Sequence, residues 1–207
     1  MIIGISGKFG SGKATVSKML ATRLSMAGYN PYYRIYAGKL KEVVEVLTSV
    51  KMTEDFDNHF IGGIRDYTHE QKNIFIPEYD MTIGKMLQYI GTDMFRCRFD
   101  EYTWVKALFR EWDNILSVDE TSAMIIPDTR FPNEADVILS RRGSVLRLEP
   151  DPNMDTGATC GRDKDHPSET SLDDYDKFTR IIKNDSTLVE LKNKIDIFVN
   201  EVLKLPT

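Results

Sequence analysis

A glycine-rich stretch near the start of the chain constrains the fold more than any other feature. Residues 7–15 read Gly-Lys-Phe-Gly-Ser-Gly-Lys-Ala-Thr, between the apolar run 2–5 and a segment whose apolar residues recur at helical spacing. Glycines let backbone N–H groups converge on an anion at a helix start, where Lys13 adds a positive charge. A glycine-rich turn without a ligand is the alternative, which the agreement of strand, spacing and helix disfavours. The sequence therefore predicts a phosphate-binding loop built from Gly10, Ser11, Gly12, Lys13, Ala14 and Thr15.

The end of this loop narrows the class of phosphate-binding protein. The residue after the lysine is usually Ser or Thr, whose hydroxyl binds magnesium, but here it is Ala14, and Thr15 follows. A Gly-Lys-small-Thr ending resembles the loop of nucleoside monophosphate kinases and disfavours switch GTPases and motor ATPases. We expect Thr15 to lie near a Mg²⁺ ion that is held mainly through nucleotide phosphates and water.

The length and charge of the chain limit its organisation and its partners. With 207 residues, of which 41% are hydrophobic, the chain is predicted to form one α/β domain with an insertion. The net charge of −5 disfavours a nucleic-acid-binding surface, because such surfaces usually carry a basic stripe that replaces phosphate counterions. We therefore expect small-molecule partners and no nucleic acid.

Cysteine usage and apolar runs bear on the compartment. Cys97 and Cys160 lie far apart and match no metal-binding spacing, so two reduced thiols are expected. The first residues lack a charged start followed by a long apolar core, and no run approaches the roughly 18 to 20 apolar residues that span a bilayer. We expect a cytoplasmic protein without membrane contact.

Strand and helix patterns alternate along the chain, which predicts an α/β fold with a parallel five-stranded sheet flanked by helices. The expected strands are Ile2 to Ser6, Tyr32 to Ala37, Ala123 to Pro127, Val145 to Glu149 and Thr179 to Lys183. The expected helices are Gly12 to Ala27, Gly38 to Val50, Thr82 to Arg96, Tyr102 to Ser117, Asn133 to Arg142 and Thr187 to Leu203.

Two stretches do not fit the alternation. Residues 51–80 mix histidine, arginine and tyrosine with glycine, and residues 151–174 are rich in Asp, Pro, Gly, Thr and Ser. Long loops inside a compact domain are usually functional flaps or disordered segments. Because phosphoryl transfer must exclude water, both stretches are predicted to be flaps or lids that cover the site within the single domain 1–207.

Asp128, Thr129 and Arg130 follow the apolar strand that ends near residue 127. Ligand groups gather at the carboxyl ends of strands in open α/β sheets. Asp128 can order magnesium-bound water there, and the planar fork of Arg130 can clamp two phosphate oxygens. A helix N-cap at Asp128, with a surface ion pair between Arg130 and Glu134, is the structural alternative.

One helix combines polar side chains that suit a nucleotide. Gln88 and Thr92 are four residues apart on one face, near Lys85, and can bind a base edge and a phosphate. Trp104 fits core packing better than base stacking on periodicity alone. Lys41, beyond the second strand, lies toward the same sheet edge as the glycine loop, although it can equally be a solvated helix charge.

Three further clusters occur in a recognisable order. They are residues 86–93 followed by 102–106, residues 126–130 with Glu134, and residues 165–170 followed by 182–188. Together with the glycine loop they make the chain resemble the deoxynucleoside monophosphate kinases of bacteriophages. The resemblance covers most of the chain and implies a P-loop kinase that uses ATP and Mg²⁺ to phosphorylate a deoxynucleoside 5′-monophosphate. It also implies a location in the host cytoplasm.

The same resemblance implies roles for individual residues. Lys13, Arg130 and Asp128 would act in catalysis, Thr15 and Asp128 near the metal, and Asn184 and Asp185 in a loop against the adenine of ATP. Leu148-Glu149-Pro150 departs from the family, whose members tend to have arginine before this proline, so Arg147 or no residue takes that phosphate contact. The implied acceptor-binding residues are Ala37, Lys41, Arg65, Lys85, Gln88, Gly91, Thr92, Trp104, Arg130 and Glu134.

Two other functions remain open on the sequence. A P-loop kinase of another small acceptor, such as dephospho-coenzyme A or a sugar acid, would share the loop. A nucleotide-dependent switch would bind ATP or GTP without an acceptor, but the sequence lacks an Asn-Lys-x-Asp guanine signature. A homodimer also remains open, because apolar residues on the helix 102–117 can form either an interface or core.

Overall fold

The centre of the molecule is a parallel sheet of five strands in the order β2-β7-β1-β8-β9. The structure is a computed structural model, and it describes residues 1–8, 10–150 and 166–204. The sheet confirms the predicted α/β fold class. Its strands are β1 (Ile2–Gly7), β2 (Asn30–Tyr33), β7 (Ser122–Ile126), β8 (Ser144–Pro150) and β9 (Arg180–Asn184).

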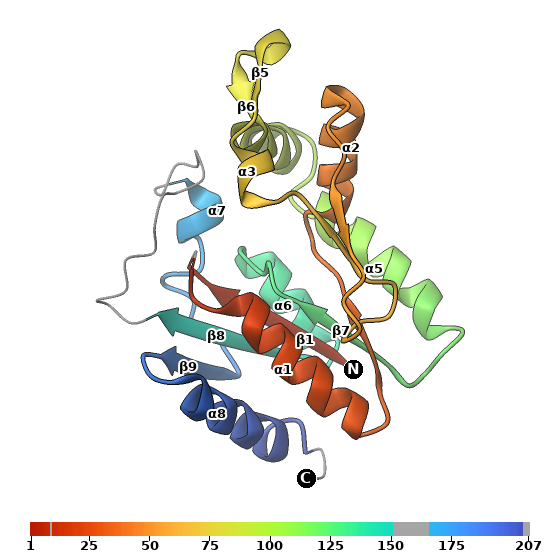
Figure 1. The fold of residues 1–207 in the computed structure, drawn as a ribbon, viewed down its shortest axis with the longest axis vertical. Helices are drawn as coiled ribbons and strands as arrows, with labels where there is room; N and C mark the ends of the chain where they lie inside the picture. The colour runs from red at the N-terminus through yellow and green to blue at the C-terminus, as the bar shows by residue number, and fades with distance from the viewer. Residues whose placement is uncertain (9, 151–165, 205–207) are drawn as a thin grey trace.

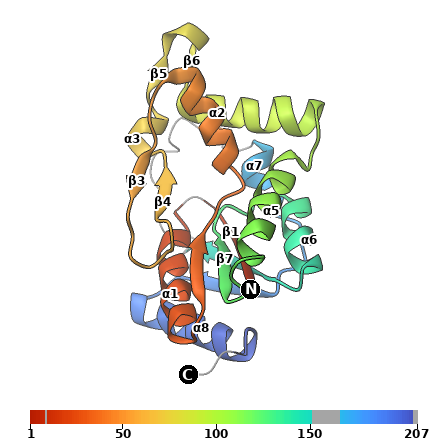
Figure 2. The same ribbon diagram turned by 90° about the vertical axis from the view of Figure 1, so that its right-hand side faces the viewer.

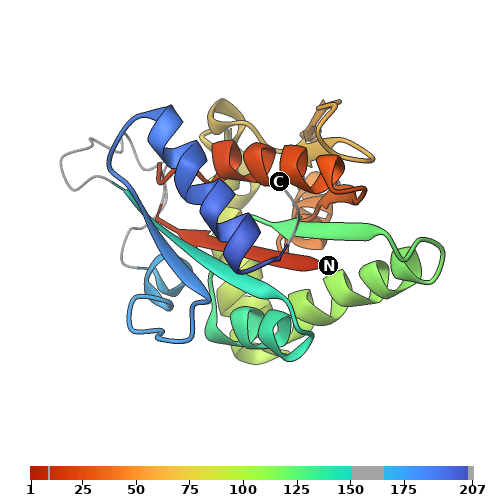
Figure 3. The same ribbon diagram turned by 90° about the horizontal axis from the view of Figure 1, so that it is seen from below.

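Helices cover both faces of this sheet. Figure 3 shows α1 and α8 on one face and α5 and α6 on the other. Further helices, α2, α3 and α7, stand above the sheet in the view of Figure 1. The helices named here are α1 (Lys13–Met26), α2 (Gly38–Thr48), α3 (His69–Lys72), α5 (Thr103–Leu116), α6 (Pro132–Ser140), α7 (Pro167–Thr170) and α8 (Leu188–Glu201).

Two hydrophobic cores lie on opposite faces of the sheet because successive strand residues point to opposite sides. Ile3 of β1 pairs with Ile125 of β7, and both are fully buried against α1 and α8. Their neighbours Ile2 and Met124 belong to the other core, with α5 and α6. Of the helices in the described part of the chain, none is both long and apolar enough to cross a bilayer.

The second strand is shorter than predicted. β2 ends at Tyr33, whereas the sequence predicts a strand as far as Ala37. It is an edge strand with Pro31 at its centre, as expected for a residue that cannot donate to a ladder. The backbone N–H groups of Tyr36 and Ala37 instead donate to the carboxylate of Asp128. These residues therefore form a loop that leads into α2.

The helix predicted over Thr82 to Arg96 changes its winding halfway. α4 (Ile83–Gln88) is α-helical, and the wider π-helix η2 (Tyr89–Arg96) continues it. Gly91 lies inside η2, where an added Cβ would stand 2.5 Å from a methyl of Leu40. Such π segments are often found at functional sites. The remaining sheet strands and flanking helices match their predicted positions within a few residues.

Residues 51–80, predicted as an irregular flap, contain regular structure. Two short antiparallel hairpins, a one-turn helix and a 3₁₀ turn (η1, Pro77–Tyr79) occupy this region and the two residues after it (Figure 2). The strands have only two or three residues each, too few for an alternating pattern to be visible in the sequence. They are β3 (Thr53–Asp55), β4 (Ile64–Asp66), β5 (Phe75–Ile76) and β6 (Met81–Thr82). Residues 151–165 of the second predicted flap, including Cys160, lie outside the described residues.

Candidate functional site

The glycine-rich loop connects β1 to α1 at the carboxyl edge of the sheet. Gly10 and Gly12 have φ angles of +79° and +90°, in the left-handed region that favours glycine. The ammonium group of Lys13 donates to the carbonyl oxygens of Gly7 at 2.7 Å and Lys8 at 2.8 Å. Lys13, the predicted phosphate-binding cation, is therefore in contact with the backbone of the glycine loop.

Polar groups of the loop fit an incoming phosphate. Ala14 and Thr15 are exposed in the first turn of α1. The hydroxyl of Ser11 is buried and has no hydrogen-bond partner within the described residues. A buried donor of this kind normally finds a partner, and a phosphate oxygen would supply one. The loop thus suits the triphosphate that the sequence predicts for it.

Asn184, at the end of β9, contacts the same loop. Its side-chain amide donates to the carbonyl of Ser11 at 3.1 Å. Its neighbour Asp185 instead pairs with Lys194 at 3.0 Å on the surface, and that bond lowers the pKa of the Asp185 carboxyl. The predicted adenine-side residues therefore divide into one that touches the loop and one that does not.

We expect Gly12→Ala to lower the melting temperature and weaken ATP binding. An alanine at φ +90° is strained by about 1 to 2 kcal/mol, and its Cβ would stand 2.6 Å from the amide nitrogen of Asn184. Gly28→Ala is the matched control, because Gly28 has φ +83° with no atom within 4 Å of the added Cβ. Thermal melting and ATP titration of both variants measure the difference. Equal losses in the two variants would show that the Asn184 contact has no effect.

A pocket lies where the carboxyl end of β7, the start of α2 and the face of α4 and η2 meet. Most of the residues predicted to bind the acceptor line it, and Arg96, Phe131 and Ser168 join them. The predicted residues in its lining are Ala37, Lys41, Gln88, Gly91, Thr92, Trp104, Asp128, Arg130 and Glu134. The structure thus brings together residues from distant parts of the chain.

Trp104 is both a core residue and part of the pocket lining. Its ring is buried, with 5% of the residue exposed, and its Nε1 donates to the carbonyl of Gly91 at 2.9 Å. The same side chain lines the pocket. Its indole therefore packs in the core while fixing the wall that η2 contributes.

Two predicted acceptor residues stand outside this pocket. Arg65 pairs with Glu45 and Glu54 and lines a neighbouring hollow beside β2 and α2. Lys85 is exposed on α4 and does not contribute to the pocket lining. Lys41, in contrast, is buried in the pocket wall and pairs with Asp66 at 2.8 Å.

Asp128 does not cap the helix that follows it but binds the loop just before α2. Its two carboxylate oxygens accept the backbone N–H groups of Tyr36 at 2.9 Å and Ala37 at 3.0 Å, just before α2 begins. A carboxylate is favourable at a helix N-terminus. Asp128 therefore fastens the residues before α2 to the end of β7, and it is also one of the residues that line the pocket.

Glu134 forms a buried ion pair with Arg96, and the surface ion pair with Arg130 that was the structural alternative does not form. One carboxylate oxygen contacts the guanidinium of Arg96, and the other accepts the backbone N–H of Arg130 at 2.7 Å and of Phe131 at 3.1 Å. Only 2% of Glu134 is exposed. Burial raises the pKa of this carboxyl to about 7, Asp128 adds to the rise, and Arg96 and the amide donors oppose it.

We expect the free energy of unfolding to fall as the pH rises from about 4.5 to about 7, with a contribution from Glu134 of up to about 1.4 kcal/mol per pH unit. The carboxyl of Glu134 binds its proton more tightly in the folded protein than in the unfolded chain. Its contribution to stability is therefore fully present below the pKa of the unfolded chain, and it is lost as the pH rises through the pKa of the folded protein. Glu134→Gln cannot titrate and should lack that slope. Urea unfolding of both proteins between pH 4.5 and 8 tests this. Parallel curves would contradict a raised pKa at Glu134.

Arg130 extends from the end of β7 to the α7 segment. Its guanidinium contacts the carboxylate of Glu169 and donates to the carbonyl of Ser168 at 3.1 Å. About a third of the side chain is exposed, at 29%. The predicted phosphate clamp therefore lines the pocket while holding a carboxylate.

Several residues of the site were not predicted to bind a ligand. The sequence assigns no ligand-binding role to Arg96, which ends the predicted helix 82–96, or to Tyr36 and Phe131. Tyr36 and Phe131 lie in the loops that follow β2 and β7, so their place after adjacent strand ends is a usable signal. Arg96 depends on the winding of η2, which the sequence pattern does not reveal.

Metal-ligating side chains were predicted at Thr15 and Asp128 only. Within the described residues, no group of three His, Cys, Asp or Glu side chains is placed to hold a metal ion. Mg²⁺ usually keeps several waters and binds through one or two protein oxygens plus substrate phosphates. The metal-side roles of Thr15 and Asp128 therefore stay predictions.

Comparison with known proteins identifies the family. The family model described as deoxynucleotide monophosphate kinase matches residues 33–195, which is well over half of the chain, and this range does not include the glycine-rich loop. No curated protein sequence matches. Among solved structures, the shikimate kinase of Bacteroides thetaiotaomicron is similar, with 14% identity, a TM-score of 0.47 and coverage of 99% of both chains. The family match confirms the resemblance found in the sequence motifs, and the chain belongs to the deoxynucleotide monophosphate kinase family.

Proposed function

We propose that this kinase transfers the γ-phosphoryl group of ATP to the 5′-phosphate of a deoxynucleoside monophosphate, giving the diphosphate. The whole chain, 1–207, would act as one domain in this reaction. The observation that carries the proposal is the position of two phosphate-binding elements after adjacent strands. The glycine loop follows β1, and Arg130 follows its hydrogen-bonded neighbour β7.

The donor triphosphate would bind in the glycine loop. The backbone N–H groups of residues 10–15 and the ammonium of Lys13 offer donors to its phosphate oxygens. Ser11 would donate its buried hydroxyl, and Asn184 would hold the loop in shape through the Ser11 carbonyl. Lys13 would exchange its two carbonyl partners for phosphate oxygens as the triphosphate enters.

The acceptor would bind in the pocket between β7, α2 and η2. Arg130 would grip the monophosphate with its planar fork, and Lys41 would add positive charge to the wall. Gln88 and Thr92, one helical turn apart, would bind the base through hydrogen bonds. Glu134 would act as a positioning residue, because both of its oxygens are already used to hold Arg96 and the backbone of Arg130.

Magnesium would be held by the nucleotide phosphates with help from Thr15 and Asp128, and when bound it would neutralise charge on the transferred group. The chain's own residues supply positioning and charge. No covalent intermediate is needed, because the acceptor phosphate is already ionised and can attack in line. Covering the site would exclude water that otherwise competes as acceptor.

A panel of acceptors tests the proposal. The enzyme is incubated with ATP and Mg²⁺ and, separately, with each deoxynucleoside monophosphate, with dephospho-coenzyme A and with sugar acids. We expect a nucleoside diphosphate from at least one monophosphate, such as dGMP or dTMP, and no product from the other acceptors. ATP hydrolysis without transfer to any monophosphate would contradict the proposal, as would transfer to the other acceptors alone.

A further inference from the structure

The α7 segment, residues 166–175, lies against Arg130, which the proposed function assigns to the monophosphate, and against Lys8 of the glycine loop, which the proposed function assigns to the triphosphate as a whole. His166 caps α7 by accepting the N–H of Ser168, and Ser168 itself lines the acceptor pocket. Figure 1 shows α7 above the ends of β1 and β8. The segment therefore forms one wall of the site, and its acidic side chains set the charge of that wall.

Glu169 lies on the acceptor side. Its carboxylate contacts the guanidinium of Arg130, with 14% of the Glu169 side chain exposed. A guanidinium binds the oxygens of a carboxylate and of a phosphate with the same planar geometry. Glu169 thus occupies Nη1 of Arg130, one of the donor groups that a monophosphate would use.

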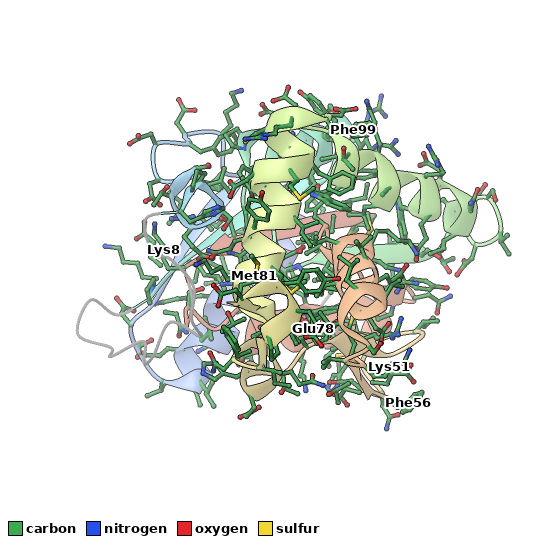
Figure 4. The ribbon with its side chains drawn as sticks, turned by 90° about the horizontal axis from the view of Figure 1, so that it is seen from above. Lys8, Lys51, Phe56, Glu78, Met81 and Phe99 are labelled. Carbon is green, nitrogen blue, oxygen red and sulfur yellow. The ribbon has the colours of Figure 1, made fainter. Side chains whose placement is uncertain are left out.

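Asp173 lies on the donor side. One carboxylate oxygen accepts from the ammonium of Lys8, in the glycine loop, at 2.5 Å, and the other accepts from Arg147 at 3.1 Å. Arg147 also donates to the hydroxyl of Ser6 at the end of β1, at 2.9 Å. In Figure 4, Lys8 lies on the side of the molecule that carries α7, across from Phe56 at the tip of the β3–β4 hairpin. The carboxylate of Asp173 therefore lies beside the first residues of the glycine loop.

The backbone of the segment is fastened at the same place. Lys8 donates to the carbonyl of Glu169 at 2.9 Å as well as to Asp173, so one lysine joins both carboxylate-bearing residues to the loop. At the other end of the segment, the Nε2 of His166 lies 3.7 Å from a carboxylate oxygen of Asp93 on η2. The α7 segment is therefore attached both to the glycine loop, through Lys8, and to the acceptor side, through Asp93 of η2.

We propose that Glu169 and Asp173 are built-in phosphate mimics that compete with the substrates, Glu169 with the monophosphate and Asp173 with the triphosphate. The inference rests on the proposed function. A carboxylate and a phosphate repel each other and cannot share one cation without a cost, so each substrate must displace its carboxylate to bind. The apparent affinity for each substrate is then lowered by the fraction of molecules in which the carboxylate holds the cation.

Neutral variants separate this inference from a purely structural role. Glu169→Gln and Asp173→Asn keep the size of the side chain and one acceptor oxygen but lose the charge that mimics a phosphate. We expect Glu169→Gln to bind dGMP or dTMP at least about threefold more tightly with little change for ATP, and Asp173→Asn to show the reverse. Asp174→Asn, a change of the same charge at an exposed neighbour, should alter neither affinity.

Isothermal titration of each variant with monophosphate alone and with ATP alone gives both affinities without turnover. Adding Glu169→Gln to Arg130→Ala should give no further gain for the monophosphate, because the cation for which carboxylate and phosphate compete is gone. Glu169→Asp keeps the charge on a shorter side chain and should fall between wild type and Glu169→Gln. Thermal melting establishes that each variant is folded.

The outcomes distinguish this inference from the proposed function. If the wild type phosphorylates a monophosphate but both neutral variants bind their substrates no more tightly, the mimicry is wrong and the carboxylates serve only to hold α7 in place. A gain for the wrong substrate in each variant would also overturn it. If the wild type phosphorylates no monophosphate, the proposed function fails, whatever the titrations show.

Discussion

Lys13→Ala should lower kcat/KM by at least about 10²- to 10³-fold while leaving the fold intact, the range found when one preorganised donor to developing charge is removed. Lys13 donates to the carbonyls of Gly7 and Lys8, which can bind water when the ammonium is removed, so only a small loss of stability is expected. Steady-state kinetics with ATP and a monophosphate measures the rate, and circular dichroism with thermal melting measures the fold.

Lys18→Ala is the matched control for this prediction. Lys18 lies on the same helix and pairs with Asp57 at 2.6 Å, away from the loop. We expect the fall in kcat/KM in Lys18→Ala to be orders of magnitude smaller than the fall in Lys13→Ala. A Lys13→Ala enzyme that retains a rate near that of Lys18→Ala would remove the glycine loop from the reaction.

Arg130→Ala should raise the KM for the monophosphate and lower kcat/KM by about 10³-fold or more, as arginines that stabilise phosphoryl transfer do. The KM for ATP should change little, because the glycine loop binds the donor. Arg130→Lys keeps the charge without the planar fork and should recover only part of the loss. Varying each substrate at saturating concentrations of the other separates the two constants.

Arg141→Ala is the matched control, because Arg130 and Arg141 lie just before and just after α6. Arg141 follows α6 and pairs with Asp113 at 2.6 Å on the surface, with its guanidinium over the ring of Phe109. We expect ordinary kinetics and at most a modest fall in melting temperature. An unchanged monophosphate KM in Arg130→Ala would assign Arg130 a structural role, which its bond to the α7 segment could supply.

The sheet and its flanking helices were predictable because their signals are local. Buried parallel strands such as β1 and β7 read as continuous apolar runs, and α1 carries apolar residues at helical spacing. The end of β2 was not predictable in this way. It is set by Asp128, which takes the N–H groups of Tyr36 and Ala37 across more than ninety residues of sequence. Such a contact leaves no local pattern.

The sequence indicates which residues line the site better than it indicates which residues they contact. Arg130, Gln88 and Thr92, selected by strand-end position and motif resemblance, line one pocket in the structure, and their binding roles stay predictions. The partners of the charged residues depend on packing, as in the pairing of Glu134 with Arg96 in place of Arg130. Charge alone does not specify which cation a buried carboxylate finds.

The order of strands in the sheet has a consequence for the reach of the reaction. β1 and β7 are joined by one hydrogen-bond ladder, with Gly4 opposite Ile126, so their backbones stay about 4.8 Å apart. In the proposed reaction, this ladder would hold the glycine loop after β1 and Arg130 after β7 in a fixed relative position, independently of the side chains that surround the acceptor. Under that proposal, residues that select the base can change without altering the spacing, whereas a slip of one residue between the two strands would move both elements out of alignment.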